Sequence, residues 1–260
     1  EPRIAKASGV FKQTFGNFRE AWKDKTFRHY SLFVAGMQCM VAISAPFFAV
    51  YMLEDLHFTY FEFVLSSVAS IVTQFITLRF WGRFSDLYGN RLVMIITSCL
   101  IPSLPLLWLF SDNYLYILAI QAFSGLAWSG FTLSTANYLY DIRPFRSDFA
   151  IYAALQAALS AGFVFVGAMV GGVIASYAAE FLIWTGLNAW LTNPIFLVFM
   201  VSTIMRSLVA LWFIPRSVEP KARPRPQLLT LIFRIRGFNA ISGVSLDWLT
   251  VAKKKRNKDK

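Results

Sequence analysis

Charged residues are scarce in this sequence. They make up 15% of its 260 residues, whereas hydrophobic residues make up 57%. A water-soluble domain carries about 25% charged residues, because its surface must be hydrated. A chain with so few polar side chains cannot coat a soluble globule of this size. We therefore expect most of its surface to face lipid.

Residues suited to catalysis, metal binding or disulfide bonding are also few. The two cysteines, Cys39 and Cys99, lie inside apolar runs, where cysteine acts as a small apolar residue. The two histidines, His29 and His57, fall on opposite faces of the expected membrane domain, and no HExxH, CxxC or phosphate-loop motif occurs. The sequence therefore predicts neither an enzyme nor a metal or cofactor site.

Long hydrophobic runs are what the sequence has in abundance. A helix needs about 20 apolar residues to cross about 30 Å of hydrocarbon. Six segments reach this length, at about Tyr30–Leu53, Tyr60–Phe80, Leu92–Phe110, Tyr114–Tyr140, Phe149–Ala178 and Ile195–Pro215. Each is expected to be helical, because backbone polar groups must be satisfied within lipid. The expected fold class is an all-α membrane protein, a bundle of six transmembrane helices.

Three regions are expected along the chain. An amphipathic cytoplasmic lead-in covers residues 1–29, the six-helix domain covers 30–215, and a basic cytoplasmic tail covers 216–260. Aromatic residues recur at helical spacing between Phe11 and Trp22, and a basic cluster runs through residues 253–256. Such segments bind membrane lipid at the inner leaflet, or alternatively serve only to orient the chain.

Basic residues are distributed unevenly between the two sides. If the six helices alternate in direction, every lysine and arginine except Arg206 falls on one side, and the opposite connections hold Glu54, Asp55, Asp112 and Glu180. Because basic residues concentrate on the cytoplasmic side, both termini are expected in the cytoplasm, with the helices in a cell (inner or plasma) membrane. The net charge of +11 then marks a membrane face and indicates no nucleic-acid partner.

The connection between the second and third segments, residues 82–91, reads GRFSDLYGNR. Glycines near both ends suit a tight turn and a close approach of helices. Asp86 can accept backbone N–H bonds at a helix N-terminus or pair with an arginine. This chemistry suits a latch on the cytoplasmic side, and a plain turn with an orienting charge is the alternative.

In this connection the sequence resembles the major facilitator superfamily. That family carries Gly-x-Leu-Ala/Ser-Asp-Arg/Lys-x-Gly-Arg/Lys-Arg/Lys between helices two and three of a six-helix half. The matching residues are Gly82, Ser85, Asp86, Gly89 and Arg91, and the departures are Phe84, Leu87 and Asn90. The departures put a full charge relay through the loop in doubt.

The resemblance implies a C-terminal half of a secondary transporter that moves a small solute by alternating access. Its N-terminal six-helix half would precede this chain, which fits a sequence that starts at Glu1. The alternative is a self-contained six-helix membrane protein that acts as a homodimeric channel or scaffold.

The resemblance also implies that the first and fourth helices line a central cavity, the second and fifth contact the other half, and the third and sixth lie outside. Polar residues recur on one face of the fourth segment, and unpaired polar groups are costly in hydrocarbon. The candidate cavity-lining residues are Gln38 in the first segment and Gln121, Ser124, Trp128, Thr132 and Asn137 in the fourth. Hydrogen bonding between helices is the alternative role.

Two ionisable residues lie inside the predicted spans. Glu62, about one turn from the outer end, is either a hydrated interfacial acid or a candidate coupling site for a proton or cation. Arg206 lies near the middle of the sixth segment, where an arginine is functional by default, unless a peripheral helix lets it extend to the inner surface.

Small residues are frequent in the fifth segment. They suit tight packing within the bundle, against a second half, or both.

Overall fold

The computed structural model describes residues 19, 21–142, 146–186, 191 and 193–216. In these ranges the elements are α2 (Lys25–Val50), the π-helical turn η1 (Tyr51–Asp55), α3 (Tyr60–Tyr88), α4 (Asn90–Leu100), α5 (Ser103–Leu107), α6 (Tyr114–Ile142), α7 (Arg146–Thr185), α8 (Ile195–Phe213) and the 3₁₀ turn η3 (Ile214–Arg216). Six stretches of this part of the chain are long and apolar enough to cross a membrane, which confirms the expected all-α, six-span bundle. Most of the expected lead-in and tail lies outside the described residues.

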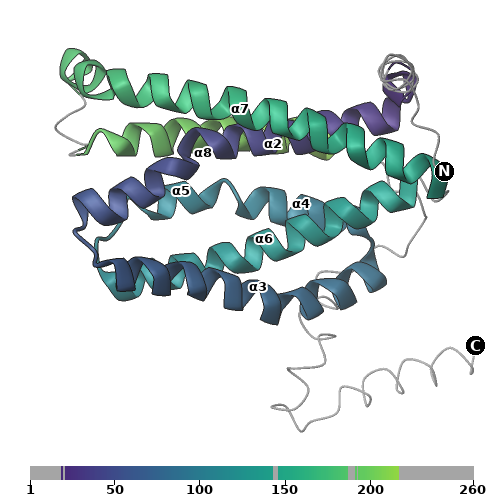
Figure 1. The fold of residues 1–260 in the computed structure, drawn as a ribbon, viewed down its shortest axis with the longest axis horizontal. Helices are drawn as coiled ribbons and strands as arrows, with labels where there is room; N and C mark the ends of the chain where they lie inside the picture. Colours follow the sequence, from purple (N-terminus) through teal and green to yellow (C-terminus); the bar gives the residue numbers. More distant parts are fainter. Residues whose placement is uncertain (1–18, 20, 143–145, 187–190, 192, 217–260) are drawn as a thin grey trace, which may run out of the picture. The chain divides into compact units, whose positions relative to one another are not determined.

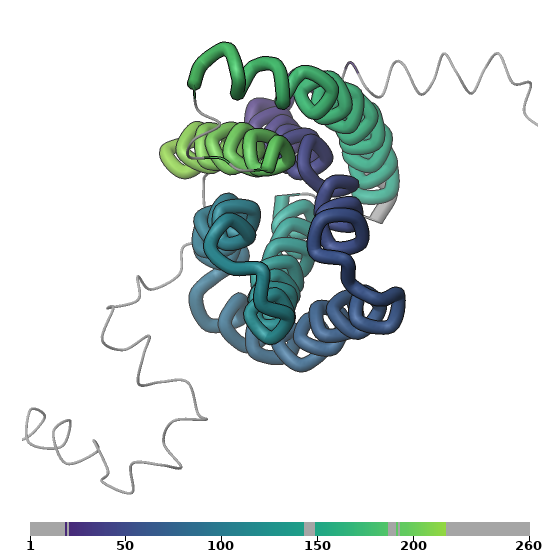
Figure 2. The backbone as a smooth tube through the Cα atoms, turned by 90° about the vertical axis from the view of Figure 1, so that its left-hand side faces the viewer, coloured from purple at the N-terminus to yellow at the C-terminus, as the bar shows by residue number. Residues whose placement is uncertain are grey.

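The six spans form two groups of three (Figures 1 and 2). One group contains α2, α7 and α8, and the other contains α3, α6 and the pair α4–α5. Within the first group α2 packs on both α7 and α8, and within the second α6 packs on both α3 and α4. The first and fourth spans are therefore the central helices of their groups.

Polar side chains fix where the helices begin. Asp24 accepts from the backbone N–H groups of Thr26 (2.8 Å) and Phe27 (3.3 Å) and so caps α2. Asn113 and Asn193 accept from backbone N–H groups in the first turns of α6 and α8. These side chains satisfy donors that a helix N-terminus otherwise leaves open.

The connection expected across residues 82–91 is much shorter in the structure. Helix α3 continues to Tyr88, and Gly89 alone separates it from α4. Gly89 adopts a φ of 95°, a conformation that glycine reaches without steric penalty. No residue between 82 and 88 interrupts the helix, so Gly82 lies within α3 rather than in a turn, with open space beside it.

The third span, expected as one helix, is broken after Leu100. Pro102 and Pro105 lack the N–H that a continuing helix requires. In an unbroken helix residue 105 would donate to the Ile101 carbonyl, and proline cannot do so. The Ile101 oxygen is therefore available to other donors in the middle of the bundle.

Small residues set the closest approaches between helices. A side chain added at Gly125 of α6 would overlap the Ser70 carbonyl of α3. Additions at Gly167 or Gly171 of α7 would overlap carbonyls of α2. Tight packing of the fifth span within the bundle is thus confirmed at two of its glycines, whereas Gly172 faces open space.

Candidate solute cavity

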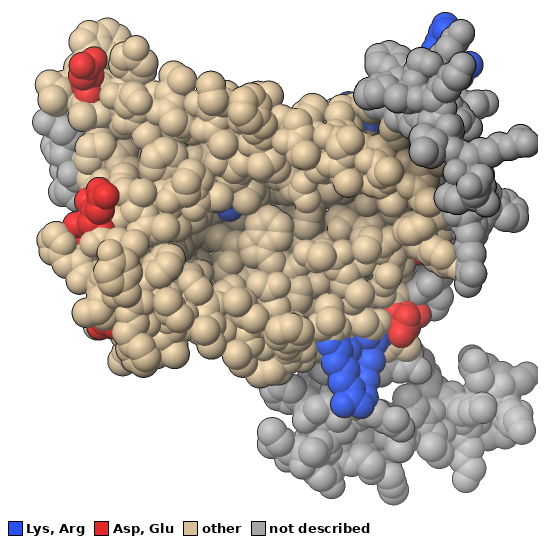
Figure 3. All heavy atoms as spheres, viewed as in Figure 1, with Lys and Arg blue, Asp and Glu red and all other residues tan. Residues whose placement is uncertain are grey.

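A cavity of about 310 Å³ lies between the two groups of helices, near the middle of the bundle. It is lined by Val41, Ala45 and Phe48 of α2, Leu104 of α5, the following Trp108, Gln121, Ser124 and Trp128 of α6, and Arg206 of α8. The space-filling view shows a hollow at this level, with Lys or Arg atoms visible inside it (Figure 3). Its walls are mostly aromatic and aliphatic, with a few polar groups, as small-molecule sites commonly are.

Three of the sequence-predicted residues meet in this cavity. Gln121, Ser124 and Trp128 follow the i, i+3, i+7 spacing of one helical face, and all three are partly exposed to the cavity. Trp128 also packs edge-on against Phe131, with ring centroids 5.7 Å apart. The predicted face of the fourth span therefore points between the two groups at this level.

The other three candidates lie outside this cavity. Gln38 is partly buried on α2, one turn from Val41 toward the end of the bundle that carries Lys25. Thr132 is exposed and lies one turn beyond Trp128 in the same direction, and Asn137 follows. The cavity ends before them because aromatic side chains fill the space between the central helices nearer that end.

That aromatic layer is well defined. Phe33 stacks on Phe213 with centroids 3.7 Å apart and meets Phe131 edge-on at 5.9 Å. Tyr30 stacks with Tyr138, and its hydroxyl donates to the Thr135 carbonyl at 2.9 Å. Within this chain, the layer separates the cavity from the basic end of the bundle, which carries Lys25, Arg28, Arg83, Arg91 and Arg216.

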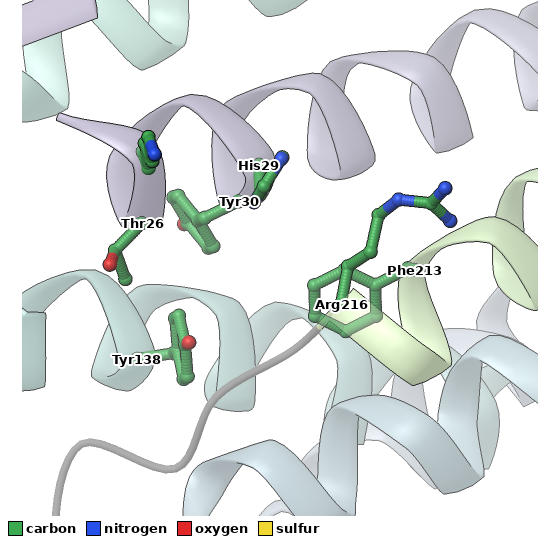
Figure 4. Close-up of a pocket in the computed structure, with 7 residues that line it drawn as sticks. Thr26, His29, Tyr30, Tyr138, Phe213 and Arg216 are labelled. Atoms are coloured by element: carbon green, nitrogen blue, oxygen red, sulfur yellow. The ribbon is translucent and has the colours of Figure 1, made fainter. Parts of the chain in front are cut away.

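A second, smaller pocket of about 260 Å³ lies at the aromatic layer on the side that faces the basic end (Figure 4). Its lining residues are Lys25, Thr26, His29, Tyr30, Tyr138, Phe213 and Arg216. The Arg216 guanidinium lies over the Trp212 ring, 5.2 Å from its centroid. The pocket places basic side chains where solute or lipid headgroups would meet the bundle.

The expectation that the third and sixth spans lie outside the cavity is wrong, because Leu104 of the third and Arg206 of the sixth line it. Arg206 is the cavity residue whose position differs most from the expectation. It does not extend to the surface, because its side chain is only 2% exposed and turns into the bundle. Its guanidinium donates to Ser44 Oγ at 2.6 Å, the Ile101 carbonyl at 3.3 Å and the Val41 carbonyl at 3.4 Å. The two prolines of the third span are visible in the sequence and indicate a carbonyl without its usual helical donor, but only the packing places that carbonyl opposite Arg206.

Glu62 lies at the end of the bundle opposite to the basic residues, and its partner there is Thr59. Its carboxylate accepts from the Thr59 backbone N–H at 2.9 Å and from the Thr59 hydroxyl at 2.8 Å, while Thr59 caps the Glu62 N–H. This reciprocal arrangement is a capping box that begins α3. Glu62 is not among the residues lining the cavity. Its coupling role stays a prediction.

Hydrogen bonds join separate elements at this acidic end, which carries Glu54, Asp55, Asp112 and Glu180. The Tyr51 hydroxyl donates to Asp112 at 2.7 Å, and the Asn193 amide donates to Asp55. These bonds connect η1 with the loop before α6 and with the start of α8. Contacts between residues so far apart in the chain were not readable from local patterns.

The residues of the predicted latch are distributed around the Gly89 turn. Ser85 is buried, Asp86 is exposed and Arg91 is partly buried. The neighbouring Asn90 is buried and donates from Nδ2 to Asp141 Oδ2 at the end of α6, at 2.7 Å. Asn90, one of the positions at which this sequence departs from the family pattern, therefore forms a hydrogen bond that joins α4 to α6.

Metal-binding groups do not gather in the described part of the chain. No cluster of three or more His, Cys, Asp or Glu side chains there has the proximity that an ion would need.

A protein-family model matches most of this chain. The model described as Major Facilitator Superfamily matches residues 31–253, which cover most of the first span and all of the other five. No curated protein matches the chain.

Proposed function

Because this chain belongs to the major facilitator superfamily, a family of membrane transporters, we propose that it forms one six-helix half of a secondary transporter. In this proposal a small solute binds in the central cavity, and the cavity opens to the two sides of the membrane in turn. The observation that carries the proposal is the cavity itself, which places Gln121, Ser124 and Trp128 between the two groups of spans. Families with this fold bind solute at the interface of their repeats, near the bilayer midplane.

The proposed second half packs against α3 and α7. Only 6% of the apolar window of α3 and 17% of that of α7 is buried, compared with 50% for α2. Exposed apolar residues on these two helices include Phe61, Phe75 and Ile76, and Phe165, Met169 and Val173. These observations support packing of a second six-helix unit against α3 and α7.

The proposed orientation places the basic end in the cytoplasm, in the inner or plasma membrane. Lys25, Arg83 and Arg216 lie at that end, and Asp55 and Asp112 lie at the other. The excess of arginine and lysine on one side supports this orientation. Figure 3 shows acidic atoms at the left-hand end of the bundle and basic atoms toward the right-hand end, where an acidic side chain also lies beside them.

Alternating access is testable without knowledge of the solute. Cysteine is placed at Ser124 in the full-length protein, in a background without Cys39 and Cys99. Membrane-impermeant thiol reagents are then added to one side or the other of sealed, oriented vesicles. We expect modification from both sides while the same vesicles remain impermeable to the reagent, because the cavity opens to only one side at a time.

The natural Cys99 supplies the control. It is exposed on α4, the first part of the third span, which should face lipid, so a protein with Cys99 as its only cysteine should stay unmodified from both sides. Modification at position 124 from both sides with leakage of the reagent would indicate the rival channel. Absence of modification from either side would contradict a hydrated cavity and, with it, the proposed transport route.

A further inference from the structure

Arg206 is the cavity residue whose charge the proposed function leaves unexplained. It is nearly fully buried, yet the three atoms to which it donates, Ser44 Oγ and two backbone carbonyl oxygens, are all neutral. Its Nε has no hydrogen-bond partner. An arginine held at this depth is costly unless it is paired or faces a hydrated path. The position therefore calls for a negative charge from elsewhere.

The cavity beside Arg206 is suited to supply that charge from a ligand. None of its lining residues is acidic, so no carboxylate in its wall competes for the guanidinium. Gln121 and Ser124 carry hydrogen-bonding groups, and Trp108 and Trp128 provide broad apolar surfaces. The volume of about 310 Å³ lies at the lower end of the range of about 300–1,000 Å³ for small-molecule sites.

The bonds to Arg206 also hold it in position. The Ile101 carbonyl accepts a 3.3 Å bond from the Leu104 N–H and also accepts from Arg206, because Pro105 lacks an N–H, and Ser44 anchors the second terminal nitrogen. These bonds use three of the five N–H groups of the guanidinium, so Nε–H and one terminal N–H remain for a ligand. An arginine whose orientation is set before binding loses less entropy when a ligand arrives.

We propose that the cavity binds an organic anion, a carboxylate-bearing molecule with an apolar or aromatic body, and that Arg206 anchors its charge. This inference rests on the proposed function, because it names the substrate class of the same cavity. Gln121 and Ser124 orient the polar end of the molecule, and the aromatic walls hold its body.

The charge of the cavity is measured with the cysteine at position 124. Its rates of modification by an anionic sulfonate-bearing methanethiosulfonate and by a cationic trimethylammonium analogue are compared. We expect Arg206→Gln to lower the ratio of anionic to cationic rates about tenfold, because a nearby cation attracts the anionic reagent. Cysteine at Thr132, exposed on the same helix but outside the cavity, is the matched control, and its ratio should change less than about twofold.

A second measurement leaves Arg206 in place. Benzoate and its neutral analogue benzamide, each at millimolar concentration, are tested for protection of the cysteine at position 124. We expect benzoate to slow modification by the cationic reagent several-fold and benzamide to have little effect. Arg206→Lys should keep part of this preference, because it preserves the charge but loses the planar fork.

The outcomes separate the two proposals. Failure of both reagents to react at position 124 contradicts the hydrated cavity and therefore the proposed function. If position 124 reacts but Arg206→Gln leaves the ratio of anionic to cationic modification rates unchanged, the anion site is overturned. Arg206 would then serve only to connect helices by hydrogen bonds. Equal protection by benzoate and benzamide, or by neither, overturns it as well. If Arg206→Gln does not fold, the comparison of benzoate with benzamide decides.

Discussion

Adjacent residues of the same type have different surroundings in this bundle. Gly171 and Gly172 are neighbours in α7, and the sequence gives no reason to distinguish them. Gly171 lies against the backbone of α2, where an added Cβ would overlap the Ile43 carbonyl, whereas Gly172 has nothing within 4 Å. The demand for a small residue therefore comes from the facing helix.

We expect Gly171→Ala to destabilise the protein by about 1–3 kcal/mol, because the α2 backbone cannot move away from the added methyl group without repacking. Thermal unfolding in detergent should show a midpoint lowered by about 2–4 °C for each kcal/mol lost. Gly172→Ala is the matched control and should change stability by less than about 0.5 kcal/mol. Equal losses from both substitutions would show that the contact with α2 does not set the size limit.

Asn90 provides a second test at the residue scale. It donates to Asp141, and Asn90→Asp would replace this bond with two facing carboxylates. We expect a loss of about 1–3 kcal/mol in thermal unfolding, because the hydrogen bond to a charged group is lost and repulsion is added. Adding Asp141→Asn should recover part of the loss. If the single substitution proves neutral, the bond between α4 and α6 contributes nothing to stability.

At the scale of helices, prolines break the third span and a glycine joins the second span to the third. The third span is divided into α4 and α5 by prolines, and the break exposes a carbonyl that Arg206 binds. The second and third spans are joined by Gly89 alone, which brings the end of α3 and the start of α4 next to each other. Such a short joint transmits movement of one helix directly to the next, and this suits the proposed latch.

We expect Asp86→Asn to shift the balance between the two open states of the cavity. A hydrogen bond to a charged group is worth about 1.5–3 kcal/mol, so losing it from one state only would change the balance about 10- to 150-fold. The readout is the ratio of modification rates from the two sides at a cysteine in position 124. Arg83→Gln, an exposed change one turn away, is the control for altered surface charge. An unchanged ratio in Asp86→Asn, with normal membrane insertion, would remove the latch role.

At a larger scale, the six spans form two groups (Figure 2), and the central cavity lies between them. The central helices α2 and α6 contribute most of its lining, and α8 contributes Arg206. Hydrogen bonds join elements at the acidic end, and an aromatic layer lies toward the basic end. This arrangement is compatible with the proposed solute site between the two groups.

The proposed topology is tested by single cysteines at Leu87 and Asn113. Both positions are exposed, whereas Asn90 is too deeply buried to report on sidedness. In intact cells, an impermeant thiol reagent should modify the cysteine at Asn113 and not the one at Leu87, because the proposed orientation places the basic end in the cytoplasm. Permeabilised cells provide the control, and both cysteines should react there. Modification of Leu87→Cys alone in intact cells would invert the topology.

Three properties of this protein can be predicted from its sequence: the all-α membrane class, the six spans and the family motif at residues 82–91. These properties depend on hydrophobic length and on a local motif, and both can be read from neighbouring residues. Three cavity residues on α6 were also predictable, because helical periodicity places Gln121, Ser124 and Trp128 on one face.

Which face of the sixth span points into the bundle depends on how the helices pack, and it cannot be predicted from the sequence. The depth of Arg206 was visible in the sequence, but its partners come from α2 and from the break after α4, more than a hundred residues away. The tie between Asn90 and Asp141 and the one between Tyr51 and Asp112 depend in the same way on which helices become neighbours. A span's periodicity identifies its polar face, whereas the partner of that face is set by how the helices pack together.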